Sequence, residues 1–233
     1  MTRSRPLEEK FDLLLPDLPG FGFSPKPVVP YDIDLFVDSL RACVEEEGLA
    51  GRPLHVVGHS LGAILALEYA ARFPENLSRM VLLSLPRFHD SESAHRMFWL
   101  GSPSYRRLLQ QNSFRQNLSQ LGRLGLGIAL RSAAGIPWEV IVDARRFTFQ
   151  SLTSTLENCL LHYSVEPALG KAPRIPTLLL HGLADQVAPF EAVARISEEH
   201  PHIALAPIAG AGHHVLHTHP RRSMARVVAH LEG

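Results

Sequence analysis

Three side chains that together can activate a serine hydroxyl lie far apart in the chain. Ser60 stands at the centre of the pentapeptide Gly-His-Ser-Leu-Gly, residues 58–62. A serine hydroxyl is a poor nucleophile until a base takes its proton, and the base needs a third group to hold its tautomer. Asp185 and His213 each follow an apolar run typical of a strand. Because reactive groups gather beyond the carboxyl ends of parallel strands, the sequence predicts a nucleophile, an orienting carboxylate and a base at one edge of a sheet.

The surroundings of Ser60 make the pentapeptide informative. An apolar run at 54–57 precedes it, and an Ala- and Leu-rich segment typical of a helix follows from 60 to about 73. A serine on such a tight strand-to-helix turn has strained backbone angles and exposes its Oγ above the sheet. We expect Gly58 and Gly62 both to be required, because a Cβ at either position would collide where strand and helix meet. Free N–H groups at the start of the helix would point at the group under attack.

The remaining chain alternates between strand-like and helix-like patterns. A helix with Asp32 or Asp34 as its cap precedes the strand before Ser60, and the pattern near the C-terminus, with Met224 and Val227 on one face, is typical of an amphipathic helix. This alternation predicts an α/β fold with a mostly parallel, doubly wound sheet. The expected further strands are residues 11–15, 78–85, 176–181 and 203–208, and a helix is expected at 189–200.

The segment from about 86 to 173 has a different pattern, with helix-like pieces and no convincing strand. A structureless loop of this length would be unusual, so we expect an inserted helical cap or lid. The predicted domains are a core formed by residues 1–86 and 174–233 and a cap formed by residues 87–173. Four cap aromatics could line an apolar acyl pocket together with His59 beside the serine, or pack between cap and sheet: Phe98, Trp99, Tyr105 and Trp138.

Four motifs spread over nearly the whole length resemble the α/β-hydrolase superfamily, in its serine-nucleophile branch with a helical cap. They are Asp17-Leu-Pro-Gly-Phe-Gly-Phe-Ser24, Gly58-His-Ser-Leu-Gly62, His181-Gly-x-x-Asp185-x-Val-x-Pro189 and Gly212-His213. The resemblance implies that Ser60 is the nucleophile, His213 the general base and Asp185 its orienting carboxylate, with the N–H of Leu61 as one oxyanion donor. A serine at this position argues against the haloalkane dehalogenase and epoxide hydrolase branches, which carry an aspartate there.

The chain departs from the family pattern at its N-terminal end. In the family several strands precede the one expected at 11–15, and a His-Gly loop after the third supplies the second oxyanion donor. Only about ten residues precede Phe11 here, so we expect an N-terminally incomplete fold. Three explanations of the missing strands are possible. The chain is a truncated form of a longer hydrolase, a second chain or dimer partner completes the sheet, or the remaining strands close directly on one another. We expect the isolated chain to be weakly active or inactive unless the donor is replaced.

Several alternative assignments compete with the triad. His214 is the competitor of its neighbour His213, and Asp90 is the competitor of Asp185. The histidines at 213, 214, 217 and 219 could suggest a metal site, but no Cys or Glu ligand set accompanies them, so we predict no metal. The segment 17–24 lacks the Lys and the helix start of a phosphate-binding loop, which argues against a nucleotide site.

Composition limits the classes of partner and the cellular location that we expect. Lys+Arg and Asp+Glu are equal at 23 each, so we expect neither a nucleic-acid nor a membrane partner. No apolar run has membrane-spanning length, and the start lacks a signal-peptide core; Cys43 and Cys159 are expected to be reduced thiols in a cytoplasmic protein.

The sequence therefore predicts a cofactor-independent serine hydrolase that acts on a small-molecule ester, thioester or lactone through an acyl-enzyme. Two alternatives stay open. One is an acyltransferase or C–C hydrolase that uses the same three residues, and the other is a non-catalytic, truncated module with this fold.

Overall fold

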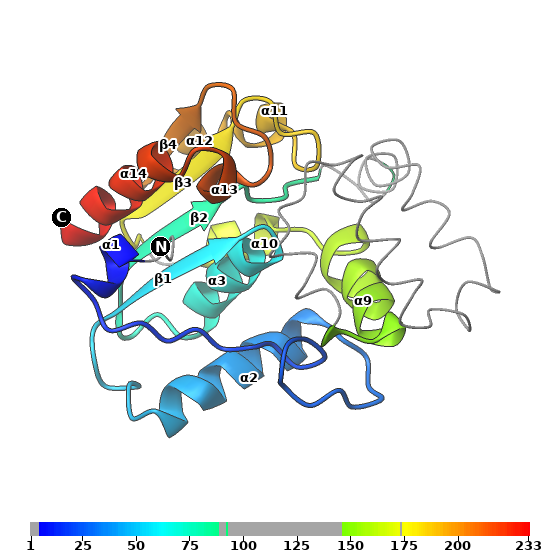
Figure 1. Ribbon diagram of the computed structural model, residues 1–233. Coiled ribbons are helices and arrows are strands. Elements are labelled where there is room, and N and C mark those ends of the chain that lie inside the picture. Colours follow the sequence, from blue (N-terminus) through cyan, green and yellow to red (C-terminus); the bar gives the residue numbers. More distant parts are fainter. Residues whose placement is uncertain (1–4, 89–91, 93–145, 173) are drawn as a thin grey trace. The chain divides into compact units, whose positions relative to one another are not determined.

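The computed structural model describes residues 5–88, 92, 146–172 and 174–233 (Figure 1). The chain forms two compact units. The first, here called the sheet unit, comprises Met1–Pro16, Val37–His89 and Ser164–Gly233, and the second comprises Asp17–Phe36 and Asp90–Tyr163. The division into a core and a cap, with boundaries at 86 and 174, stays a prediction.

The sheet unit is built on four parallel strands in the order β1-β2-β3-β4 (Figure 1). These are β1 (Leu54–His59), β2 (Leu77–Leu83), β3 (Thr177–Gly182) and β4 (Ile203–Ile208). Each strand pairs in parallel with the next, as in the register Val57 to Val81 between β1 and β2. The parallel α/β class predicted from the alternating pattern is therefore confirmed.

Helices cover both faces of this sheet, as continuous apolar strands require. Helix α3 (Leu61–Arg72) contacts β1 and β2, and α14 (Pro220–Glu232) contacts β2 and β3 from the other side of the sheet (Figure 1). The one-sided pattern near the C-terminus has its expected role, because Met224, Val227 and Leu231 of α14 pack on the sheet. The sheet residues in this cluster alternate along their strands and are Val81, Leu83, Leu178, Leu180, Ala206 and Ile208.

Short helices complete the sheet unit. They are α1 (Arg5–Glu8) beside α14, α10 (Glu166–Lys171) beside α3, α11 (Phe190–Val193) and α12 (Ile196–Glu199) between β3 and β4, and α13 (Val215–Thr218). The single helix expected at 189–200 is thus two short helices with a turn at 194–195. Within the described part of the chain, no helix is both long and apolar enough to cross a membrane.

The prediction of a strand at residues 11–15 is wrong. Residues 12–18 carry no regular structure, and Leu15 is 79% exposed. A strand exists only when a neighbour satisfies its backbone hydrogen bonds. The described residues provide no strand partner for this segment, although its composition is apolar.

In the second unit, serine hydroxyls join segments that are distant in sequence. Ser151 of α9 (Phe149–Leu156) donates its hydroxyl hydrogen to the carbonyl of Gly20 at 2.9 Å. The N–H of Tyr31 donates to Oγ of Ser154 at 2.8 Å. A π-helical turn, η2 (Glu157–Leu161), follows α9 directly. These contacts attach residues 17–36 to the described end of the insertion.

Two local features of the second unit follow from side-chain chemistry. The N–H of Leu35 donates to Oδ1 of Asp32 at 2.9 Å, so of the two expected caps it is Asp32 that caps α2 (Ile33–Glu46). The turn at 17–24 closes around Asp17, whose carboxylate accepts the N–H of Phe23 at 2.8 Å. A carboxylate therefore fills this glycine-rich turn.

Candidate active site

The nucleophile candidate lies on a strained turn between β1 and α3. Ser60 has φ 55° and ψ −118°, a conformation that a residue with a Cβ adopts at a cost of order 1–3 kcal/mol. Its N–H donates to the carbonyl of Leu83 on β2 at 2.9 Å, and its carbonyl accepts the N–H of Ala63 at 2.9 Å. The turn is therefore fastened to both the sheet and the helix, with the side chain at the carboxyl end of β1.

The two glycines of the pentapeptide have different roles. A Cβ on Gly58 would lie 2.0 Å from the carbonyl oxygen of Gly62 and 2.7 Å from the nitrogen of Ala63, so only glycine lets β1 and α3 approach this closely. A Cβ on Gly62 would meet none of the described atoms within 4 Å. The expectation that both glycines avoid a collision where strand and helix meet is therefore correct for Gly58 and wrong for Gly62, because neither β1 nor any other described segment approaches that position in the first turn of α3.

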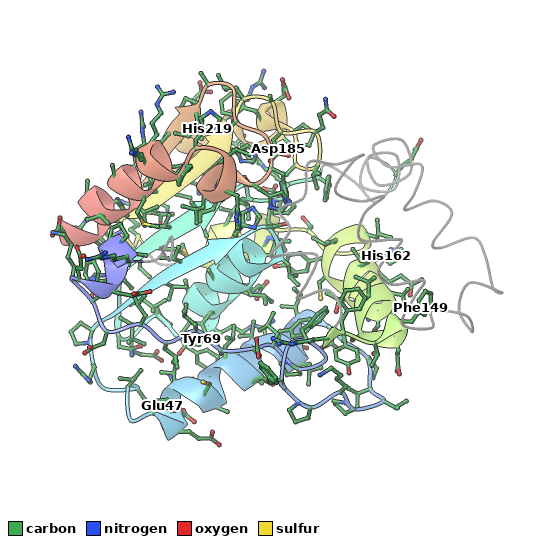
Figure 2. The ribbon with its side chains drawn as sticks, in the orientation of Figure 1. Glu47, Tyr69, Phe149, His162, Asp185 and His219 are labelled. Atoms are coloured by element: carbon green, nitrogen blue, oxygen red, sulfur yellow. The ribbon has the colours of Figure 1, made fainter. Side chains whose placement is uncertain are left out.

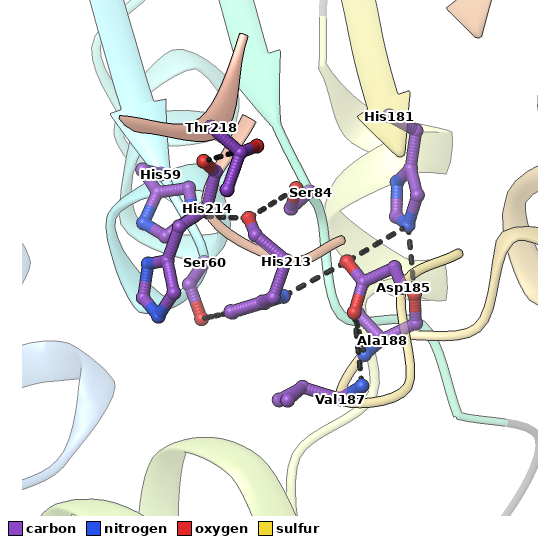
Figure 3. Close-up of polar contacts among 10 residues, drawn as sticks. All are labelled: His59, Ser60, Ser84, His181, Asp185, Val187, Ala188, His213, His214 and Thr218. Atoms are coloured by element: carbon purple, nitrogen blue, oxygen red, sulfur yellow. Dashed lines mark hydrogen bonds and ion pairs between the residues drawn. The ribbon is translucent and has the colours of Figure 1, made fainter. Parts of the chain in front are cut away.

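The structure brings together all three side chains of the expected triad (Figure 3). His213 lies in the loop after β4, with Nε2 2.9 Å from Oγ of Ser60 and Nδ1 2.9 Å from Oδ2 of Asp185. An ionised carboxylate can only accept, so the hydrogen-bond pattern assigns the ring hydrogen to Nδ1. The lone pair of Nε2 then faces the serine hydroxyl, which is the arrangement that a general base needs.

Asp185 lies in the loop after β3 (Figure 2). Hydrogen-bond donors surround its carboxylate (Figure 3). Its side chain is fully buried, and its Oδ1 accepts the N–H groups of Val187 and Ala188, both at 2.9 Å. Burial alone would raise the pKa of this carboxyl. Hydrogen bonds from His181, His213 and the Ala188 N–H outweigh that effect and hold the pKa well below its usual range. Asp185 is therefore ionised at neutral pH.

Two residues of this region have no role in the sequence-based prediction. His181, at the end of β3, is fully buried, with Nε2 2.7 Å from the carbonyl of Ala188 and 3.4 Å from Oδ2 of Asp185. Ser84, directly after β2, donates its hydroxyl hydrogen to the carbonyl of His213 at 2.8 Å. The spacing of four residues between His181 and Asp185 is a signal that could have pointed to the first. Nothing in the local sequence points to the second.

The other histidines near the triad are arranged around His213. His59 has its ring centroid 5.0 Å from that of His213 and 5.3 Å from that of His214. Burial lowers the pKa of His59 to about 4 and that of His214 to about 4, and the neighbouring His213 adds to both shifts. Hydrogen bonds to Ser60 and Asp185 are made by His213, which distinguishes it from its competitor His214.

The remaining sequence-based candidates are only partly covered by the described residues. The competing acid Asp90 and the expected pocket aromatics lie outside the described residues; these aromatics are Phe98, Trp99, Tyr105 and Trp138. In the part of the chain that the structure describes, no group of three or more His, Cys, Asp or Glu side chains is arranged to hold a metal ion. Leu61 begins α3, where the first N–H groups have no acceptor within the helix, so its predicted role as oxyanion donor agrees with its position.

This arrangement can perform base-assisted nucleophilic attack. His213 can take the proton of the Ser60 hydroxyl as Oγ attacks, and the ionised Asp185 can stabilise the imidazolium that forms. A developing oxyanion near the start of α3 would meet the positive end of the helix dipole. These features suit the transfer of an acyl group to serine.

Comparisons with known proteins agree with this fold. The family model described as "alpha/beta hydrolase fold" matches residues 4–220. Among solved structures, an esterase from Exiguobacterium antarcticum superposes with a TM-score of 0.71 at 18% identity, over 93% of this chain and 80% of that chain. At this identity the likeness concerns the fold alone.

Three relatives of known activity are similar over much of the chain. A cis-3-alkyl-4-alkyloxetan-2-one decarboxylase of Shewanella oneidensis is 27% identical over 90% of this chain and 70% of its own length. A pimeloyl-[acyl-carrier protein] methyl ester esterase of Nitrosospira multiformis is 28% identical over 96% and 86%. A 2-hydroxymuconate semialdehyde hydrolase of a Pseudomonas species is 29% identical over 77% and 62%. With a family match over almost its whole length, the chain belongs to the alpha/beta hydrolase fold family and is a hydrolase.

Proposed function

We propose that this protein is a serine hydrolase that cleaves a carboxylic ester, thioester or lactone through an acyl-enzyme on Ser60. The observation that carries the proposal is the continuous hydrogen-bond chain from Ser60 Oγ to His213 and on to Asp185, with both distances at 2.9 Å. The ionised, buried carboxylate holds the base in the tautomer that can accept the serine proton. The methyl ester esterase among the relatives gives the ester class independent support.

The proposed reaction has two halves that balance in protons. Oγ of Ser60 attacks the carbonyl carbon while Nε2 of His213 takes its proton, and the tetrahedral intermediate expels the alcohol, thiol or lactone oxygen, which receives that proton. A water molecule then attacks the acyl-enzyme, giving a proton to Nε2 in the same way. The acid product leaves and Ser60 regains its hydrogen.

The oxyanion of both tetrahedral intermediates would be stabilised at the start of α3. Leu61 N–H is the donor that we assign within the described residues. Removing one of two such donors typically lowers kcat by about 10²–10³-fold. With the Leu61 donor alone, we expect a turnover that is slower by about this factor than that of a site with two donors.

Hydrolysis of activated esters by the full chain tests the proposal. We would measure kcat and KM with p-nitrophenyl acetate and butyrate, a phenyl thioester and a small lactone, in parallel for Ser60→Ala. A matched control is Ser78→Ala, because Ser78 is an exposed serine on β2 outside the triad. We expect slow turnover that disappears in Ser60→Ala and is unchanged in Ser78→Ala. Hydrolysis that survives Ser60→Ala would contradict the proposal.

A second candidate uses the same serine with another bond or acceptor. The 2-hydroxymuconate semialdehyde hydrolase among the relatives favours it, since that protein resembles this chain at a similar identity. Product analysis distinguishes the possibilities. Added alcohol or amine would divert the acyl group into a new ester or amide in an acyltransferase, whereas a hydrolase would release mainly the free acid. Cleavage of 2-hydroxymuconate semialdehyde with weak esterase activity would favour a C–C hydrolase.

A further inference from the structure

The backbone carbonyl of His213 accepts two side-chain hydrogen bonds. Nε2 of His59 and Oγ of Ser84 each lie 2.8 Å from this oxygen (Figure 3). His59 is the last residue of β1 and Ser84 follows β2, so adjacent strands deliver the two groups to one carbonyl. A carbonyl can only accept, which assigns the hydrogen of the His59 ring to Nε2. Both lone pairs of the His213 carbonyl are thereby used.

Ser84 holds its place at a conformational cost. Its φ of 48° lies in the left-handed region, which a residue other than glycine rarely adopts. The residue is fully buried, and its N–H donates to the carbonyl of Leu180 on β3 at 3.0 Å. Such strain persists where the surrounding structure enforces it, often at functional sites. Here the strained residue directs a buried hydroxyl at the loop that carries the base.

His59 is suited to donate a hydrogen bond without introducing a charge. Burial lowers the pKa of its ring to about 4, so it is neutral at neutral pH. Its ring lies 5.0 Å from that of His213, centroid to centroid. A neutral neighbour can support the base without repelling the imidazolium that forms during catalysis.

Separate contacts hold the same loop on the other side of His213. The carbonyl of Ala211 accepts the N–H of Ala184 at 2.9 Å. A Cβ on Gly182 would lie 2.4 Å from that carbonyl oxygen, so the glycine lets the loop rest against the end of β3. These contacts fix the backbone two residues before His213. The bonds from His59 and Ser84 fix the peptide that follows it, and with it the direction of the His213 side chain.

We propose that His59 and Ser84 are positioning residues. Their hydrogen bonds to the His213 carbonyl set the alignment of the His213 ring with the Ser60 hydroxyl. This inference rests on the proposed function. A displacement of about 1 Å in a catalytic group can cost about 10²-fold in rate. The expected loss therefore falls on kcat, because neither residue needs to touch the substrate for this role.

The test compares variants of the full chain that keep or remove each donor. His59→Phe and Ser84→Gly remove the hydrogen bond, whereas His59→Gln keeps an N–H donor close to the position of Nε2. Ser84→Gly also relieves the backbone strain, so the variant should stay folded. Matched controls are His202→Phe and Ser78→Ala, which lie in the sheet unit away from the triad. Thermal unfolding checks that each variant is folded.

We expect kcat for a p-nitrophenyl ester to fall about 10-fold in each donor-removing variant and about 100-fold in the double variant, with KM within about twofold. His59→Gln should recover most of the activity, and both controls should match the wild type. A structural role alone would lower stability without this separation of kcat from KM. Wild-type kcat in folded His59→Phe and Ser84→Gly, or a loss confined to KM, would overturn the proposal.

A second readout keeps the test independent of turnover. The Nδ1 hydrogen of His213 bonded to Asp185 should give a resolved downfield proton signal in nuclear magnetic resonance spectra. We expect this signal to broaden or shift in His59→Phe and Ser84→Gly and to persist in the controls. An unchanged signal in both variants would contradict the positioning role. Absence of wild-type ester hydrolysis, with the signal still sensitive to both variants, would instead count against the proposed function.

Discussion

Strands β1 and β3 have equal lengths and both lead to the active-site candidates, but their surroundings differ. All six residues of β3 are buried, whereas β1 has exposed positions and Val57 is 40% exposed. β3 pairs with a strand on each side, while β1 pairs with β2 as its single partner among the described strands. Asp185 therefore follows an interior strand, and Ser60 follows an edge strand of the described sheet.

This difference indicates that the two side chains are positioned by different means. The interior of the sheet fixes the end of β3, and the buried donors around Asp185 follow from that burial. At the end of β1, local backbone geometry contributes more than burial to the position of Ser60. The close approach of β1 and α3 at Gly58, and the hydrogen bond from Ser60 N–H to Leu83, hold the nucleophile in place.

The largest expected effect is on stability, from truncating one side chain in each strand. Leu179 of β3 is fully buried, so Leu179→Ala should lower the free energy of unfolding by about 2–5 kcal/mol. Val57 of β1 is half-exposed, so Val57→Ala should lower the free energy of unfolding by less than about 1 kcal/mol, because little packing is lost. Urea denaturation of both variants measures the difference. Equal losses in the two variants would remove the contrast between the strands.

As the pH falls, the stability that depends on His59 at the end of β1 should be lost before the stability that depends on Asp185 after β3. The pKa of His59 falls from 6.5 to about 4 on folding, so between these pH values the unfolded chain binds more protons. Its contribution of up to about 3 kcal/mol is complete above pH 6.5 and is lost as the pH falls through 4. His214 contributes with the same sign. The carboxyl of Asp185 has a lowered pKa, so its contribution is lost only at more acidic pH, below about 3.9.

The free energy of unfolding as a function of pH, in wild type and in His59→Gln, checks this order. The variant should lose less stability than the wild type between pH 6.5 and 4. Parallel curves over that range would show that His59 does not contribute in this way.

A smaller effect is expected from a methyl group at the turn before Ser60. Gly58→Ala places a Cβ 2.0 Å from a backbone oxygen of α3, and backbone cannot move aside cheaply. We expect a loss of about 1–3 kcal/mol and a fall in kcat, because the strand and helix must separate. Chemical denaturation and ester turnover measure both. Wild-type values in this variant would show that the close approach is not needed.

The smallest effect, and one of opposite sign, is expected at Gly62. A Cβ there meets none of the described atoms within 4 Å, and the residue is helical. Gly62→Ala should therefore raise the free energy of unfolding by about 0.5–1 kcal/mol, because alanine loses less backbone entropy in a helix. The same denaturation assay applies. A loss of stability here would mean that the second glycine, too, avoids a collision.

Local patterns in the sequence were sufficient for features that depend on local geometry. The turn at Ser60 follows from Gly58 and the apolar segments around it. The start of the helix near residue 33 follows from a capping aspartate before an amphipathic pattern, although the pattern does not distinguish Asp32 from Asp34. The positions of Ser60, Asp185 and His213 at strand ends, together with the resemblance to the α/β-hydrolase family, predict that these side chains meet. On sequence alone His214 and Asp90 stayed as competitors.

Features that depend on distant partners could not be predicted. The segment 11–15 has strand composition, but whether it forms a strand depends on a neighbour for its backbone, which local sequence does not reveal. Ser84 contributes through a hydrogen bond to a carbonyl 129 positions away in the chain. The lack of any described atom within 4 Å of a Cβ on Gly62 likewise depends on how the surrounding segments pack.

Covalent labelling tests most directly whether Ser60 is a nucleophile that His213 and Asp185 activate. The full chain would be treated with a fluorophosphonate, and the adduct located by mass spectrometry of peptides. We expect one adduct per chain, on Ser60, that is absent in Ser60→Ala and forms much more slowly in His213→Ala and Asp185→Asn. An adduct on another residue, or labelling of Ser60 at an unchanged rate in those two variants, would contradict this role of Ser60.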